Sequence, residues 1–245
     1  MKKIVTLILL SIAVGLFAQS RLEINIFNEP QFKYEEINFV DFMFKNIKAD
    51  SVSQVNILSG KVLSKPQNDS LTVSFLNRIK PDIACPTDYY YQNTDDNFNL
   101  LSSNVASDSI FFMDSVIVPA DSFKVGFLAI NSPDNFVKNG KPEHINLDYD
   151  MFDITREKSR QLAQKCDVVI LLSNMGKFVD KSMIAGTEVD FVLSFDYQKK
   201  RNETFKSGQK FYSILSRKGK YGKLVLDYRH GKLSSDWQQI EIKRN

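Results

Sequence analysis

The sequence contains few histidines and cysteines and no glycine-rich phosphate loop, which are the usual elements of several common catalytic sites. Its 245 residues include two histidines, His144 and His230, and two cysteines, Cys85 and Cys166. It contains no CxxC pair, no glycine-rich phosphate loop and no GxSxG nucleophile motif. These absences exclude cysteine zinc motifs, P-loop nucleotide binding and α/β-hydrolase chemistry. The two cysteines fall at the expected ends of strands, which favours two buried free thiols over a disulfide. A disulfide would be possible in a protein exported from the cytoplasm.

Long apolar runs are confined to the first twenty residues. A pair of lysines, an apolar run from Ile4 to Phe17 and the small residue Ala18 match the three regions of a signal peptide. We therefore expect residues 1–20 to direct export to the periplasm or the outside of a bacterial cell. Residues 21–245 are then one domain without a membrane span.

The formal net charge of +3 conceals an uneven distribution. Residues 198–245 contain 13 Lys and Arg against 4 Asp and Glu, so the rest of the chain has a net charge of −6. Such a basic end suits phosphate-rich lipid or polysaccharide, but the simpler interpretation is a set of solvated strand faces. Nothing in the sequence indicates a nucleic-acid partner.

The hydrophobic pattern predicts an α/β fold with mixed sheets. The first ninety residues alternate strand and helix, with helical spacing from Ile37 to Ile47 and from Leu71 to Ile79. A further helix is expected from Thr155 to Lys165, and a short one after Gly176. Gly219, Gly222 and Gly231 are expected to mark turns, and Trp237 to be a core contact of the last strand. The expected strands are Leu22–Phe27, Val55–Leu58, Ile83–Cys85, Leu100–Val105, Ser109–Val118, Phe123–Ile130, Asp167–Ser173, Val189–Gln198, Phe211–Leu215, Lys223–Tyr228 and Trp237–Ile242.

Six blocks, in order, carry a resemblance to a known family. They are DIACPTDYYY from Asp82, LLSSNV from Leu100, VGFLAINSPD from Val125, DVVILLSNMG from Asp167, VDFVLSFDYQ from Val189 and SRKGKYGKLVLDY from Ser216. Together they resemble the 5'-nucleotidase branch of the calcineurin-like metallophosphatases. The resemblance implies a four-layer α/β/β/α sandwich whose pocket lies at the carboxyl ends of the strands. It also implies the catalytic-type domain alone, without the C-terminal domain that selects a nucleoside.

The same resemblance places the family's metal-binding positions on residues that are mostly not metal ligands. Its first Asp-x-His falls on Glu29 and Gln31, and its bridging aspartate falls on Lys61. The Asn-His pair becomes Asp88 and Tyr89. The three later histidines become Asn174, Asp196 and Gln198.

These replacements predict a protein without the ancestral reaction. A dinuclear hydrolase needs imidazole and carboxylate ligands around two cations, and amide oxygens are poor substitutes for transition metals. A lysine at the bridging position would repel both cations. We therefore expect no cofactor and a catalytically inactive binding or scaffold protein.

Two alternatives stay open. The oxygen donors at the replaced positions suit a single hard cation, Ca²⁺ or Mg²⁺, which would support a remodelled, metal-dependent phosphoester hydrolase. Alternatively, Tyr89, Tyr90 and Tyr91 at the mouth of the pocket stack on a glycan or a protein partner, since tyrosine has an apolar face and a polar tip.

Overall fold

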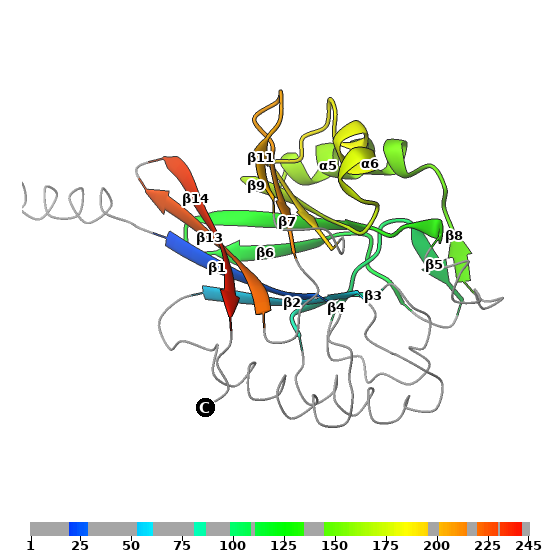
Figure 1. The fold of residues 1–245 in the computed structure, drawn as a ribbon, viewed down its shortest axis with the longest axis horizontal. Coiled ribbons are helices and arrows are strands. Elements are labelled where there is room, and N and C mark those ends of the chain that lie inside the picture. The colour runs from blue at the N-terminus through cyan, green and yellow to red at the C-terminus, as the bar shows by residue number, and fades with distance from the viewer. Residues whose placement is uncertain are drawn as a thin grey trace, which may run out of the picture.

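A computed structural model gives the fold, and it describes residues 20–28, 53–60, 81–86, 99–108, 111–134, 145–195, 201–214, 220–229 and 231–241. Within these ranges the chain forms two six-stranded sheets, one two-stranded sheet and two helices (Figure 1).

The first sheet is mixed and has the strand order β14-β13-β1-β2-β3-β4. The neighbours β1 to β4 run parallel, whereas β13 pairs antiparallel with β1 and β14 antiparallel with β13. Apolar residues alternate along β1, so Leu22, Ile24 and Ile26 all point to one face and are fully buried. The strands are β1 (Ser20–Asn28), β2 (Ser53–Gly60), β3 (Ile83–Pro86), β4 (Asn99–Leu100), β13 (Lys220–Arg229) and β14 (Lys232–Glu241).

The second sheet has the order β11-β12-β10-β9-β7-β6 and is also mixed. Its four central strands run parallel, and an antiparallel strand closes each edge. Every residue of β9 and β10 is buried, as expected of parallel strands covered on both faces. The strands are β6 (Val116–Ala120), β7 (Phe123–Ile130), β9 (Val168–Ser173), β10 (Phe191–Ser194), β11 (Asn202–Thr204) and β12 (Lys210–Ser213).

The main core lies between the two sheets, which are stacked face to face (Figure 1). The Trp237 ring from β14 stacks on Tyr212 from β12 with 4.9 Å between centroids, so one aromatic pair joins the sheets. Burying a Leu or Ile side chain here contributes about 1.5–3 kcal/mol relative to exposure. The predicted core role of Trp237, which is 6% exposed, is confirmed.

Two helices cover the outer face of the second sheet (Figure 1): α5 (Met151–Ala163) and α6 (Lys177–Met183). Leu162 of α5 packs with Leu128 and Val169 of the sheet. A Cβ atom on Gly126 of β7 would lie 2.9 Å from Leu162 Cδ2, so glycine permits this close approach of helix and strand. The described layers are therefore helix, sheet and sheet. The predicted fourth layer, with its helices from Ile37 to Ile47 and from Leu71 to Ile79, lies outside the described residues.

A small two-stranded sheet extends from one end of this sandwich (Figure 1). It pairs β5 (Val105–Ser107) antiparallel with β8 (Ile145–Leu147). The buried side chains of Val105 and Ile145 form its own small apolar cluster. The sequence did not predict β8 or β11, because three residues are too few to show an alternating pattern.

Several expectations need correction. Gly222 is not a turn residue but lies inside β13, where a Cβ atom would meet the Trp237 ring at 2.3 Å. The expected strand Leu100–Val105 stops at Leu100 and turns, because Ser103 and Asn104 direct their side chains to other backbone groups. Helix α5 starts at Met151 rather than Thr155.

The expected turn at Gly231 and the free thiols are confirmed, the expected turn at Gly219 lies outside the described residues, and only one of the two thiols is fully buried. Gly231 has φ of 74° in the turn between β13 and β14. Both cysteines are free; Cys85 is buried, which raises the pKa of its thiol, and Cys166 is half-buried.

Candidate functional site

The parallel strands of the second sheet bring polar residues to one edge. Ile130, the last residue of β7, pairs in register with Ser173, the last residue of β9. The residues that follow, Asn131 and Asn174, therefore emerge side by side. The carboxyl edge of a parallel sheet is where α/β proteins place their binding groups.

Asn131 is held by a buried network of amides and hydroxyls. The Asn104 side chain makes two hydrogen bonds to its backbone: Asn104 Nδ2 donates to Asn131 O at 2.8 Å, and Asn131 N–H donates to Asn104 Oδ1 at 2.9 Å. Asn131 Nδ2 donates to Ser102 Oγ at 3.0 Å. Asn104 and Asn131 are 2% and 3% exposed, so these bonds replace the water that the amides lose on folding.

Asn174 completes this network at the end of β9. Its Oδ1 accepts a hydrogen bond from Ser132 N–H at 2.6 Å, and its Nδ2 donates to Asn131 Oδ1 at 3.2 Å. The side chain therefore ties the end of β9 to the end of β7. Both ends of its amide are used within the protein.

The next turn is fixed by a buried carboxylate. Ser173 Oγ donates to Asp180 Oδ1 at 2.5 Å and accepts from Met175 N–H at 3.1 Å. Asp180 belongs to α6 and is fully buried. This pair, with Gly176 at φ of 89°, sets the path from β9 into α6.

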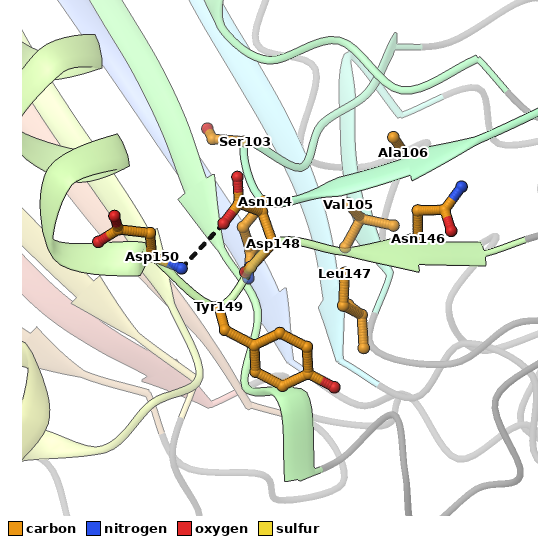
Figure 2. A pocket seen from close by; sticks show the side chains of 9 residues that line it. All are labelled: Ser103, Asn104, Val105, Ala106, Asn146, Leu147, Asp148, Tyr149 and Asp150. Carbon is orange, nitrogen blue, oxygen red and sulfur yellow. Dashed lines mark hydrogen bonds between the residues drawn. The ribbon is translucent and has the colours of Figure 1, made fainter.

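A pocket of about 690 Å³ lies beside this network, against the small sheet (Figure 2). Its buried side is Asn104 and Val105, whereas Asn146, Asp148 and Tyr149 on its rim are exposed. The Tyr149 side chain projects from the loop between β8 and α5 and is 62% exposed (Figure 2). The lining residues are Ser103, Asn104, Val105, Ala106, Asn146, Leu147, Asp148, Tyr149 and Asp150.

Asn104, which is hydrogen-bonded to Asn131, also makes a hydrogen bond within the pocket. Asp148 N–H donates to Asn104 O at 2.9 Å, and Asp148 Oδ1 accepts from Asp150 N–H at 2.9 Å (Figure 2). The rim is thus rigid at Asp148 and offers an aromatic ring, carboxylates and an amide. These groups can stack on an apolar face and accept hydrogen bonds from hydroxyls.

Solved structures of similar fold give the comparison. The NAD nucleotidase of Haemophilus influenzae matches with a TM-score of 0.73 and 13% identity, over 92% of this chain and 57% of that chain. The calcineurin-like phosphoesterase YfkN from Bacillus subtilis matches with a TM-score of 0.63 and 14% identity, over 91% of each chain. A 5'-nucleotidase precursor from Thermus thermophilus gives a TM-score of 0.66 and 11% identity, over 92% of this chain and 55% of that chain.

The chain has the metallophosphatase fold of the 5'-nucleotidase type. It spans little more than half the length of the Haemophilus and Thermus chains. No protein-family model matches the sequence, and no curated protein sequence does either. The likeness therefore lies in the fold.

Of the predicted site residues on this metallophosphatase fold, the structure describes Asn174. The strands that lead to the other positions are as expected, since β1, β2 and β3 end at Asn28, Gly60 and Pro86. The remaining predicted residues lie outside the described ranges: Glu29, Gln31, Lys61, Asp88, Tyr89, Tyr90, Tyr91, Asp196 and Gln198.

The Asn174 amide is engaged within the protein on both sides. Its oxygen accepts from Ser132 N–H and its nitrogen donates to Asn131, so a cation bound at the oxygen would share it with the Ser132 hydrogen bond. Within the described ranges, no group of three or more His, Cys, Asp or Glu residues could hold a metal ion. The same ranges contain no helix with the length and hydropathy to cross a bilayer.

Sequence reasoning missed Asn104, Asn131 and the pocket around Tyr149. One signal was present: Asn131 directly follows the apolar run that ends at Ile130, as Asn174 follows the run that ends at Ser173. Polar residues after two parallel strands are expected to meet. The pocket gave no such signal, because β8 is too short to be recognised.

Proposed function

We propose that this protein is an exported binding protein that keeps the metallophosphatase fold without metal-dependent phosphoester hydrolysis. The observation that carries the proposal is the pair of hydrogen bonds made by the Asn174 side chain. Its amide stands where the resemblance places a metal-binding histidine, and it serves as a link between two strands.

The full sequence supports the same proposal. A dinuclear centre needs several imidazoles and a bridging carboxylate. The chain offers two histidines, His144 and His230, and neither falls in a block that resembles the family's metal positions. The resemblance also places Lys61 at the bridging position, where its ammonium group would repel cations.

The pocket around Tyr149 supports a binding role. Its exposed tyrosine ring can stack on the face of a sugar, while Asn146 and Asp148 can hydrogen-bond to hydroxyl groups. The lining does not suit an anionic ligand, because it contains carboxylates and no basic side chain, whereas a hydroxyl-rich ligand can donate hydrogen bonds to these carboxylates. This extends the sequence-based alternative of glycan recognition to a different tyrosine.

The decisive experiment combines metal analysis of the purified protein with a broad phosphoesterase assay. We expect no turnover of nucleotides or simple phosphate esters with Mn²⁺, Zn²⁺, Mg²⁺ or Ca²⁺, with the Bacillus YfkN phosphoesterase as positive control. Metal-dependent turnover that is lost in Asn174→Ala or Asp196→Ala would refute the proposal. A calcium-dependent rise in melting temperature would favour the hard-cation alternative instead.

A glycan screen tests the pocket. Tyr149→Ala should abolish binding to any glycan that the protein retains, because it removes the stacking surface. Phe111→Ala is the matched control, since Phe111 is 80% exposed and does not line the pocket. Equal binding by the two variants would remove the pocket from the proposed function.

Export is tested by cell fractionation. The full-length chain should reach the periplasm or the medium, and a chain that lacks residues 1–20 should stay in the cytoplasm. Retention of the full-length chain in the cytoplasm would contradict this part of the proposal.

A further inference from the structure

Three cations surround one carboxylate at the outer edge of the second sheet. Lys177 Nζ contacts Glu203 Oε1, Lys181 Nζ lies 3.2 Å from Glu203 Oε2, and Arg201 Nη1 lies 4.0 Å from Glu203 Oε1. We name Lys177, Lys181, Arg201 and Glu203 the Glu203 cluster. Three positive charges against one negative charge give it a formal charge of +2.

The cluster is separate from the pocket around Tyr149. Lys177 and Lys181 come from α6, and Glu203 comes from the edge strand β11. In the sheet order β11-β12-β10-β9-β7-β6, the cluster lies at β11, whereas the amide network joins β9 and β7.

The surplus charge is poorly neutralised within the cluster. Hydrogen bonding from Lys177 is the main cause that lowers the pKa of Glu203. The ionised carboxylate offsets one of the three positive charges around it. The Lys177 side chain is 11% exposed, which limits the solvent screening of its charge. Lys181 and Arg201 are 41% and 48% exposed and have several N–H donors each, so they can reach a ligand from solvent.

Aromatic rings flank these cations. The Lys181 ammonium lies 4.8 Å from the centroid of the Phe205 ring, which helps to hold it in place. Phe178 lies three residues before Lys181 on α6, so the two share a helix face, and Phe178 is 81% exposed. An exposed ring on the same face as a cation suits a ligand with an anionic head and an apolar part.

We propose that the Glu203 cluster binds a phosphate-type oxyanion, carried either by a soluble ligand or by a phospholipid headgroup. The anion would be held by Arg201, whose guanidinium can donate two parallel hydrogen bonds, and by the ammonium of Lys181. Lys177 and Glu203 would form the fixed base of the site. This inference does not depend on the function proposed for the pocket.

The first test measures the melting temperature of the intact protein in inorganic phosphate and in chloride at equal ionic strength. The test variant is Lys181→Gln with Arg201→Gln, which leaves the Lys177–Glu203 pair intact. The matched control is Arg156→Gln with Lys158→Gln. It also removes one arginine and one lysine, here from the ion pairs Arg156–Asp153 and Lys158–Asp114. Trp237 fluorescence confirms that each variant is folded.

We expect a saturable, phosphate-specific rise in melting temperature for the native protein and the control, and an affinity about tenfold or more lower in the test variant. An equal response of test and control variants would overturn the proposal, because the effect would then follow net charge alone. Absence of both phosphate binding and vesicle binding would overturn it as well.

The second test identifies the source of the anion by cosedimentation with vesicles of phosphatidylglycerol and phosphatidylcholine. If the source is a headgroup, the protein binds anionic vesicles and not neutral ones, and both the test variant and Phe178→Ser lose this binding. Phosphate binding without vesicle binding indicates a soluble ligand. Vesicle binding that is equally strong in the test and control variants would refute the site.

Discussion

Asn174→Ala distinguishes a structural amide from a ligand-binding one. The substitution removes the acceptor for Ser132 N–H and the donor to Asn131 Oδ1. A typical intramolecular hydrogen bond contributes about 1 kcal/mol net, and Asn131 becomes partly unsatisfied while it is 3% exposed. We therefore expect the free energy of unfolding to fall by about 2 kcal/mol.

Urea denaturation gives the measurement, with the single tryptophan as the probe. Trp237 is 6% exposed and stacks on Tyr212 across the two sheets, so its fluorescence reports the opening of the main core. With a denaturant slope of about 3 kcal/mol per molar urea, the midpoint should fall by about 0.7 M. Asn146→Ala, which removes an exposed amide from β8, is the control and should move it by much less.

The outcome that would refute this reasoning is specific. If Asn174→Ala leaves the urea midpoint unchanged but abolishes a metal-dependent stabilisation or activity of the native protein, then the amide is a ligand. The hydrogen bonds to Ser132 and Asn131 would then be incidental, and the proposed loss of the metal centre would fail with them.

Three further substitutions test the fold around the site. Asn104→Leu should lower the free energy of unfolding by about 3 kcal/mol in the same urea assay, because it leaves the buried backbone N–H and C=O of the residue after β7 unpaired. Gly222→Ala should cost about 1–3 kcal/mol or more and shift the fluorescence of Trp237, since the new Cβ would lie 2.3 Å from its ring. Glu23→Gln should lower the free energy of unfolding by about 2 kcal/mol at pH 7 and reduce the fall of that free energy as the pH drops. Burial tends to raise the pKa of Glu23, but hydrogen bonds from Lys223 and a neighbouring arginine outweigh it and hold this pKa below 4.5. The unfolded chain therefore binds more protons than the native one below about pH 4.5, and native stability falls as the pH drops further.

Each of these predictions has a matched control. Asn146→Leu repeats the amide replacement at an exposed position. Gly208→Ala adds a methyl group where nothing lies within 4 Å, so its cost is the strain of φ at +79° alone. For Glu23→Gln, the matched control is Glu157→Gln, which makes the same replacement on the exposed side of α5.

The sequence predicts the framework of this fold because the framework depends on apolar periodicity. The expected strand Phe123–Ile130 is β7, and the expected strand Asp167–Ser173 differs from β9 by one residue. In both, six or more buried positions repeat a pattern that is specific to a covered parallel strand. Edge strands such as β11 were missed because three residues with exposed and half-buried side chains lack that pattern.

The site was harder to predict, since amide pairing depends on three-dimensional register. Asn174 was selected by resemblance, but its partners Asn131 and Ser132 are defined only by the pairing of Ile130 with Ser173. The pocket depends on Asn104, which lies 27 residues before Asn131 in the chain and is joined to it by two hydrogen bonds. Neither link leaves a periodic signal, because each joins single residues that are far apart in the chain.

These observations give a physical reason why the fold can persist without imidazole ligands. In a metal centre, the cations themselves hold the loops at the carboxyl edge together. Here Asn174 joins the end of β9 to the end of β7, and Asn104 joins the end of β7 to the turn before β5, through hydrogen bonds that need no ion. Ser173, Ser194 and Ser213 end three neighbouring strands in register, and each is buried, so the edge is closed by small hydroxyl-bearing residues. Within the described residues, this edge of the second sheet is therefore held by hydrogen bonds and by buried serines. The pocket around Tyr149 and the Glu203 cluster lie outside this network, and they are the two surfaces that we propose as ligand sites.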